Sequence, residues 1–166
     1  MALETVFLDA GGVLLFPNWV RVSEALARHG VTVLPKTLAH AELRAKRRMD
    51  VAETIATTTD TSRGWLYFEL TLTEAGIPLS DATHAALEEL HLYHRELNLW
   101  EHVPDTVVPA LKALRARGLR LTVVSNANGT LCRHLDRLDL TRWFVTRSCK
   151  KMKIDFGDFW NCRTVK

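Results

Sequence analysis

The chain has 166 residues, of which 47% are hydrophobic and 25% are charged, and this composition excludes a disordered or fibrous protein. Its net charge of +3 is too small to predict binding to nucleic acid, and no apolar run has the roughly 20 residues of a membrane-spanning helix. The start of the chain lacks the pattern of a signal peptide, and three scattered cysteines do not suggest a disulfide framework. We therefore expect a cytoplasmic protein without nucleic-acid or membrane partners, whose oligomeric state cannot be read from the sequence.

The N-terminal segment predicts a buried strand that ends in a glycine-rich turn. Thr5–Asp9 is a short apolar run that ends in an acid, and Gly11 and Gly12 follow almost at once. Because glycine tolerates positive φ and permits close approach, the backbone N–H groups of Ala10, Gly11 and Gly12 can point toward an anion. An aspartate beside such a turn is a suitable nucleophile for phosphorus or carbon.

The middle of the chain predicts four helices and no strand. Apolar residues recur there at helical spacing, and polar or glycine-containing segments separate the periodic stretches. The polar segment 57–62 is interpreted as a loop, with Asp60 or Ser62 capping the third helix. The expected helices span residues 18–29, 34–51, 65–75 and 81–97.

Strand and helix signals alternate again after residue 99. Asp105 is expected to cap a helix that Gly118 terminates, and the β-rich segment 119–124 predicts a second strand. A further helix and a further strand are expected at residues 128–138 and 143–147. Alternation on both sides of a helical insert predicts an α/β fold with a Rossmann-like parallel sheet.

Polar residues that could perform chemistry follow both predicted strands. Asp9 ends the first strand, and Ser125 and Asn126 directly follow the second. The carboxyl ends of parallel strands line the ligand crevice of an open α/β sheet, so we expect these side chains to lie close together. The Ser125 hydroxyl and the Asn126 amide could then donate hydrogen bonds to a group transferred to Asp9.

These two segments resemble the haloacid-dehalogenase-like (HAD) hydrolase superfamily. Val6–Leu14 is similar to its first motif, an apolar strand running into Asp-x-Asp-x-Thr/Val, and Leu121–Asn126 is similar to its second motif. The helical insert stands where members with a type I cap carry that cap. The resemblance covers about residues 3–146 and implies an incomplete HAD core at 1–17 and 100–147, an α-helical cap at 18–99 and an atypical tail at 148–166.

The resemblance implies a hydrolase, most readily of the phosphatase type, that acts on a small phosphorylated metabolite. Asp9 would be the nucleophile, Ser125 would bind the phosphoryl group, and Asn126 would orient the substrate. The turn Ala10–Gly12 would bind phosphate. Mg²⁺ would be held by the Asp9 carboxylate and the Gly11 carbonyl, and the cap would exclude water and select the substrate.

Three departures from the family pattern lead us to expect weak or no turnover. Gly11 replaces the second aspartate of the first motif, which usually serves the leaving group as acid and base. Gly157 stands where the family has a lysine, and the acidic pair of the fourth motif would lie beyond residue 166. The tail 148–166, where lysine replaces arginine as the common basic residue, is interpreted as an altered or truncated end.

Two other functions stay open at this point. A 2-haloacid dehalogenase would use the same aspartyl ester on a halogenated substrate without a metal, and Gly11 permits this. A catalytically inactive binding module is favoured by the missing lysine and acid. We do not interpret His84, His91 and His94 as a metal site, or the basic segment 44–48 as a phosphate or nucleic-acid site. In both cases we expect a solvent-exposed helix face.

Overall fold

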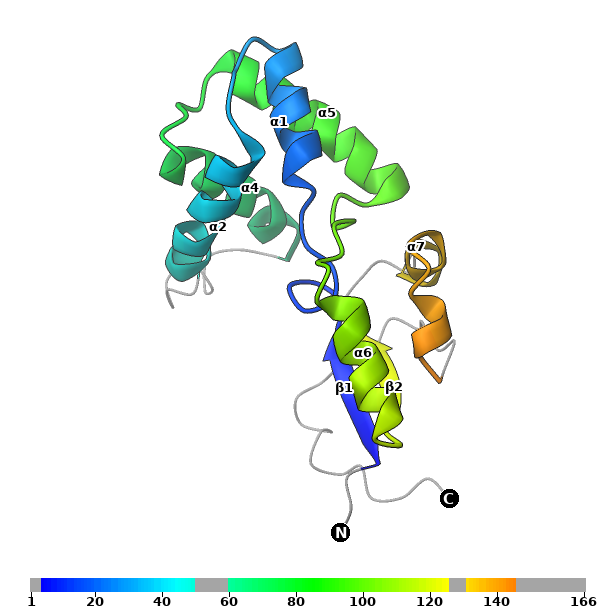
Figure 1. The fold of residues 1–166 in the computed structure, drawn as a ribbon. Coiled ribbons are helices and arrows are strands. Elements are labelled where there is room, and N and C mark those ends of the chain that lie inside the picture. Colours follow the sequence, from blue (N-terminus) through cyan, green and yellow to red (C-terminus); the bar gives the residue numbers. More distant parts are fainter. Residues whose placement is uncertain (1–3, 50–59, 126–130, 146–166) are drawn as a thin grey trace. The chain divides into compact units, whose positions relative to one another are not determined.

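A computed structural model describes residues 4–49, 60–125 and 131–145, with side chains in the second range described from Trp65 onward. The chain divides into two compact units, one made of Met1–Pro17 and Trp100–Lys166 and the other of Asn18–Leu99 (Figure 1). The described residues are mostly helical and contain one small parallel sheet. None of the described helices is long and apolar enough to cross a membrane.

The first unit contains the parallel sheet. Strand β1 (Thr5–Asp9) pairs with β2 (Arg120–Val124) from Thr5 opposite Arg120 to Asp9 opposite Val124. Helix α6 (Val107–Ala116) precedes β2 in the chain and lies along the sheet in Figure 1. The parallel pairing confirms the predicted α/β arrangement in part, since the described sheet has two strands rather than a full Rossmann-like set.

Alternating apolar residues of the two strands form the centre of this unit's core. Leu121 and Val123 of β2 are buried, while the intervening Thr122 is only partly buried. This is the period-two pattern of a strand that buries one face. Helix α7 (Leu131–Arg137) and the turn after β1 complete the core. Its other buried members are Ala10, Leu14, Leu15, Val107, Leu111, Leu131, Leu135 and Leu140.

Two predictions for this unit are wrong. Asp105 does not cap α6, because the helix begins at Val107 after Thr106, whose own side chain makes no capping hydrogen bond. The predicted strand at 143–147 is also wrong at its start, because Thr141–Trp143 is a 3₁₀ turn. Of the described residues 143–145, Val145 bonds to the sheet, through its N–H to the Leu121 carbonyl at 3.0 Å.

The second unit contains four described helices. Helix α1 contacts α5 and α2, and α2 contacts α4. Their bounds are Trp19–Arg28 for α1, Pro35–Met49 for α2, Asp60–Glu74 for α4 and Asp81–Leu97 for α5. Helix α5 begins and ends as predicted, and Ser80 and Thr83 form a capping box at its start. Helix α4 begins five residues earlier than predicted, so Ser62 lies within the helix rather than ahead of it.

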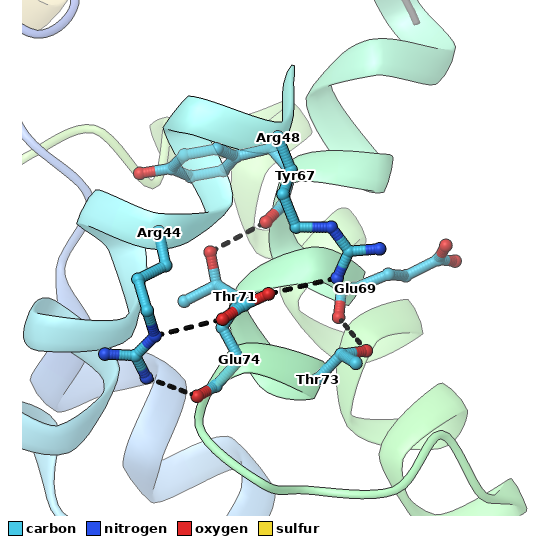
Figure 2. A network of polar contacts seen from close by, with 7 residues as sticks. All are labelled: Arg44, Arg48, Tyr67, Glu69, Thr71, Thr73 and Glu74. Carbon is cyan, nitrogen blue, oxygen red and sulfur yellow. Dashed lines mark hydrogen bonds and ion pairs between the residues drawn. The ribbon is translucent and has the colours of Figure 1, made fainter. Parts of the chain in front are cut away.

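Ion pairs join α2 to α4 in this unit (Figure 2). The Arg44 Nε and Arg48 Nη1 atoms lie 2.9 and 3.0 Å from the two carboxylate oxygens of Glu74, and Arg44 also donates to the Glu74 carbonyl. Both arginines lower the pKa of the Glu74 carboxyl by hydrogen bonding. Part of the basic segment 44–48 therefore holds two helices together, in addition to facing solvent.

Replacing Glu74 with glutamine should slightly lower the midpoint of thermal unfolding, because both arginines lose their charged partner. Exposed ion pairs contribute little individually and are screened by salt. The difference from the wild type should therefore shrink when the salt concentration is raised from about 0.05 to 0.5 M. Scanning calorimetry at both salt concentrations would measure it; a difference that does not depend on salt would contradict an electrostatic role.

Candidate active site

The strand register brings two of the predicted site residues to one edge of the sheet. Asp9 pairs with Val124, and the N–H of Ala10 donates to the Val124 carbonyl at 3.1 Å, so the two chains remain paired just beyond β1. Ser125 directly follows Val124. The backbones of Asp9 and Ser125 therefore leave the sheet side by side at its carboxyl edge, where open α/β sheets bind ligands.

The turn after Asp9 is closed by its own backbone hydrogen bonds. The Ala10 carbonyl accepts from the N–H groups of Leu14 and Leu15 at 3.0 and 2.8 Å, and the Gly12 N–H donates to the Leu15 carbonyl at 2.8 Å. Gly12 has a φ of 77°, a conformation that favours glycine. Ala10 is buried, whereas Gly11 and Gly12 are exposed.

This bonding limits which amides of the turn could receive an anion. The N–H groups of Ala10 and Gly12 are both donated to carbonyls of the protein. The Gly11 N–H has no acceptor among the residues that the structure describes. Of the three amides expected to bind phosphate, the Gly11 amide is thus the one that could do so without breaking an existing bond.

The surroundings of the Asp9 side chain determine which groups an anionic substrate would meet there. Its side chain is exposed, and within the described part of the chain it forms no ion pair. The ion pair between Arg120 and Glu4, at 3.1 Å, lies at the opposite end of the same two strands. An anionic substrate at Asp9 would therefore meet backbone and hydroxyl donors rather than a described cation.

The donor set around Asp9 does not make a complete Mg²⁺ site. Mg²⁺ prefers six oxygen ligands in near-octahedral geometry and is commonly held by one or two carboxylates together with waters and phosphate. Here the predicted ligands are one carboxylate, from Asp9, and one carbonyl, from Gly11. Residues 4–49, 60–125 and 131–145 contain no group of three histidine, cysteine or acidic side chains able to hold a metal. Mg²⁺ binding stays a prediction, and we assign no step to it.

A buried histidine lies close to Trp100, the residue at which the chain returns to this unit after the helical insert, and the sequence did not predict it. His134 in α7 is 4% exposed, and its Nε2 lies 2.6 Å from the Trp100 carbonyl. Burial lowers the pKa of His134, and the nearby Arg137 guanidinium acts in the same direction. A neutral ring can donate from Nε2 to Trp100 and accept from Arg137 at Nδ1, 3.3 Å away.

The Arg137 side chain also pairs with Glu101 at 2.9 Å, so two contacts fix α7 to the segment that follows the helical insert. His134 occupies the apolar stripe of α7 with Leu131 and Leu135. Helical spacing alone would have placed His134 in the core, but the carbonyl that it contacts is 34 residues away and leaves no sequence signal.

Several predicted features lie outside the described residues. These are Asn126, the start of the helix expected at 128–138, residues 146 and 147 of the expected strand, and the whole tail 148–166 with Gly157. Their predicted roles stay predictions.

No protein-family model matches this sequence, and no curated protein does. Among solved structures, one match is the crystal structure of a predicted phosphoglycolate phosphatase from Haemophilus somnus 129PT. It has 16% sequence identity and a TM-score of 0.46, and the alignment covers 86% of this chain. The chain spans 60% of the length of that protein. A likeness of this size does not establish a family or an activity.

Proposed function

We propose that this chain is a HAD-like hydrolase of the phosphatase type, which transfers a phosphoryl group from a small phosphorylated metabolite to Asp9 and then to water. The observation that carries this proposal is the pairing of Asp9 with Val124, because it supports joint action of Asp9 and Ser125 on one substrate. The exposed Asp9 carboxylate and the Gly11 N–H, which has no acceptor among the described residues, support it further.

In the first step, an Asp9 carboxylate oxygen attacks phosphorus, and the bond from phosphorus to the leaving oxygen breaks. The Gly11 N–H and the Ser125 hydroxyl would donate hydrogen bonds to the phosphoryl oxygens as charge develops there. In the second step, water attacks the phosphorus of the aspartyl phosphate. Inorganic phosphate leaves, and the Asp9 carboxylate is restored.

We expect the leaving oxygen to take its proton from solvent, because position 11 cannot supply one. Position 11, two residues after the nucleophile, is a glycine and has no acid to donate. General acid catalysis typically contributes about 10²–10⁴-fold to the rate. We therefore expect slow turnover overall, and the slowest turnover for substrates whose leaving group is an alkoxide.

The test is formation of the aspartyl phosphate. The full chain, incubated with acetyl phosphate, should gain the mass of one phosphoryl group on the peptide containing Asp9, measured by mass spectrometry after acid quenching. Asp9→Asn should reduce this labelling by on the order of 10³-fold or more, because a nucleophile is lost outright. Asp105→Asn, an exposed acid in the same unit, is the matched control and should label normally. Equal labelling of the Asp9→Asn variant would contradict the proposal.

A second candidate, a 2-haloacid dehalogenase, is permitted by glycine at position 11, because displacement of a halide needs no acid there to protonate the leaving group. Asp9 would attack the carbon that carries the halogen, the halide would leave, and water would hydrolyse the ester. Halide release from 2-chloropropionate in the presence of EDTA, lost in Asp9→Asn, would support this function over the phosphatase.

A further inference from the structure

A groove lies between α4 and α5 in the helical unit. Its volume is about 560 Å³, which falls within the roughly 300–1,000 Å³ typical of small-molecule sites. All of its described lining residues lie within Asn18–Leu99, and none of them is a residue of the proposed active site. Its lining residues are Trp65, Glu69, His84, Leu87, Glu88, His91 and Leu92.

Trp65 gives the groove a fixed aromatic wall. Its ring stacks on His91, with the centroids 4.5 Å apart and an interplanar angle of 16°, and it meets Phe68 at 5.6 Å. Leu87 is buried beside it, while Leu92 is 62% exposed. An exposed leucine next to a held tryptophan provides apolar surface that a ligand could cover.

The two carboxylates of the groove differ from three other glutamates of this unit. Glu42, Glu74 and Glu89 each form an ion pair with a lysine or arginine. Glu69 and Glu88 have no ion pair within the described part of the chain. Both acids among the described lining residues of the groove therefore have no cationic partner in the part of the chain that the structure describes.

We propose that this groove binds a small organic cation, an amine or guanidinium carried on an apolar body. Glu69 and Glu88 would neutralise the positive charge, and Trp65, Leu87 and Leu92 would cover the apolar body. A metal ion fits less well, because the acids and histidines of the groove do not form a three-ligand group in the described structure. An anion would be repelled by the two carboxylates. The site is independent of Asp9.

Three probes with the same phenyl body test the charge requirement: phenethylamine, 2-phenylethanol and phenylacetate. Binding to the full chain at pH 8 would be followed by the NMR shift of the Trp65 indole N–H, assigned with a Trp65→Phe variant. Phenethylamine should give a saturable shift, 2-phenylethanol a weaker one, and phenylacetate none. Equal affinity for the three probes, or no saturable shift with phenethylamine, would overturn the proposal.

Variants that each remove one carboxylate test whether the groove binds the cation specifically or whether any negative charge on the protein attracts it. Glu69→Gln and Glu88→Gln should each weaken phenethylamine binding by about two- to fivefold, the range expected for exposed ion pairs. Glu24→Gln removes the same charge from an exposed position on α1 and should leave the affinity unchanged. Circular dichroism would verify that all three variants fold. Equal weakening by all three variants would show non-specific attraction and contradict the site.

Discussion

Gly11→Asp should raise the rate of alkyl phosphate hydrolysis by about 10²–10⁴-fold, the usual contribution of a positioned general acid. The substitution places a carboxyl group two residues after Asp9, where it can donate a proton to the leaving oxygen. The backbone accommodates it, since a Cβ built at Gly11 meets no atom within 4 Å. Its φ also lies outside the left-handed region, in contrast to the φ of 77° at Gly12. Steady-state release of inorganic phosphate from glycerol phosphate would measure the gain.

Gly11→Asn is the matched control, because asparagine has the same shape and cannot donate an acidic proton. It should leave turnover at the wild-type level. The comparison substrate is p-nitrophenyl phosphate, whose leaving group needs no proton and should therefore gain little from Gly11→Asp. Equal gains on both substrates, or equal rates for the Asp and Asn variants, would contradict the inferred role of position 11.

Strand ends were the most predictable part of the candidate site. Thr5–Asp9 was predicted as a strand at its observed bounds, and the second strand was predicted one residue early. Both are apolar runs bounded by turn residues, so local pattern suffices. Their parallel pairing is expected because a long helical connection, which ends in α6, lies between them. For this reason the sequence alone predicts that Asp9 and Ser125 lie close together.

Hydrogen bonds between distant residues were not predictable in the same way. The glycine-rich turn indicated three amides available for an anion, but Leu15 returns to accept the Gly12 N–H, and Val124 accepts the Ala10 N–H. Similarly, the N–H of Val145 bonds to the carbonyl of Leu121, which is 24 residues away in the chain. These arrangements depend on tertiary partners, on which local propensity carries no information.

Glu42 is the clearest case of a residue that helical patterning misassigns. Glutamate within a basic helix suggests a solvent-facing position, yet Glu42 is only 7% exposed. Its carboxylate accepts from the Trp19 indole N–H at 2.9 Å and lies 2.6 Å from the Lys46 ammonium. The buried hydroxyl of Tyr67 also interacts with it, and burial together with this carboxylate raises the pKa of Tyr67. The carboxylate thus bonds polar groups of α1 and α2 and interacts with Tyr67 of α4.

Glu42→Ala should lower the free energy of unfolding of the helical unit by about 1–3 kcal/mol at pH 7. The buried Trp19 N–H would lose its acceptor, while the partly exposed Lys46 can regain water. Urea unfolding followed by far-UV circular dichroism would measure the loss. Glu24→Ala, at an exposed position of α1, should change stability by no more than about 0.5 kcal/mol. A similar loss in both variants would contradict a special role for Glu42.

The pH dependence of the same carboxylate gives an independent test. Burial raises the pKa of Glu42, but favourable interactions with Lys46, Tyr67 and Trp19 outweigh it, and the pKa in the folded protein lies below its ordinary value. A lowered folded pKa contributes stability above the unfolded value of about 4.3 and loses it as the pH falls through the folded value. Wild type should therefore be more stable than Glu42→Gln at pH 7, and the difference should shrink steadily below about pH 4. A difference that stays constant from pH 7 to pH 3 would mean that the amide and the carboxylate serve the buried donors equally well, and that the ionised form has no part in holding α1, α2 and α4 together.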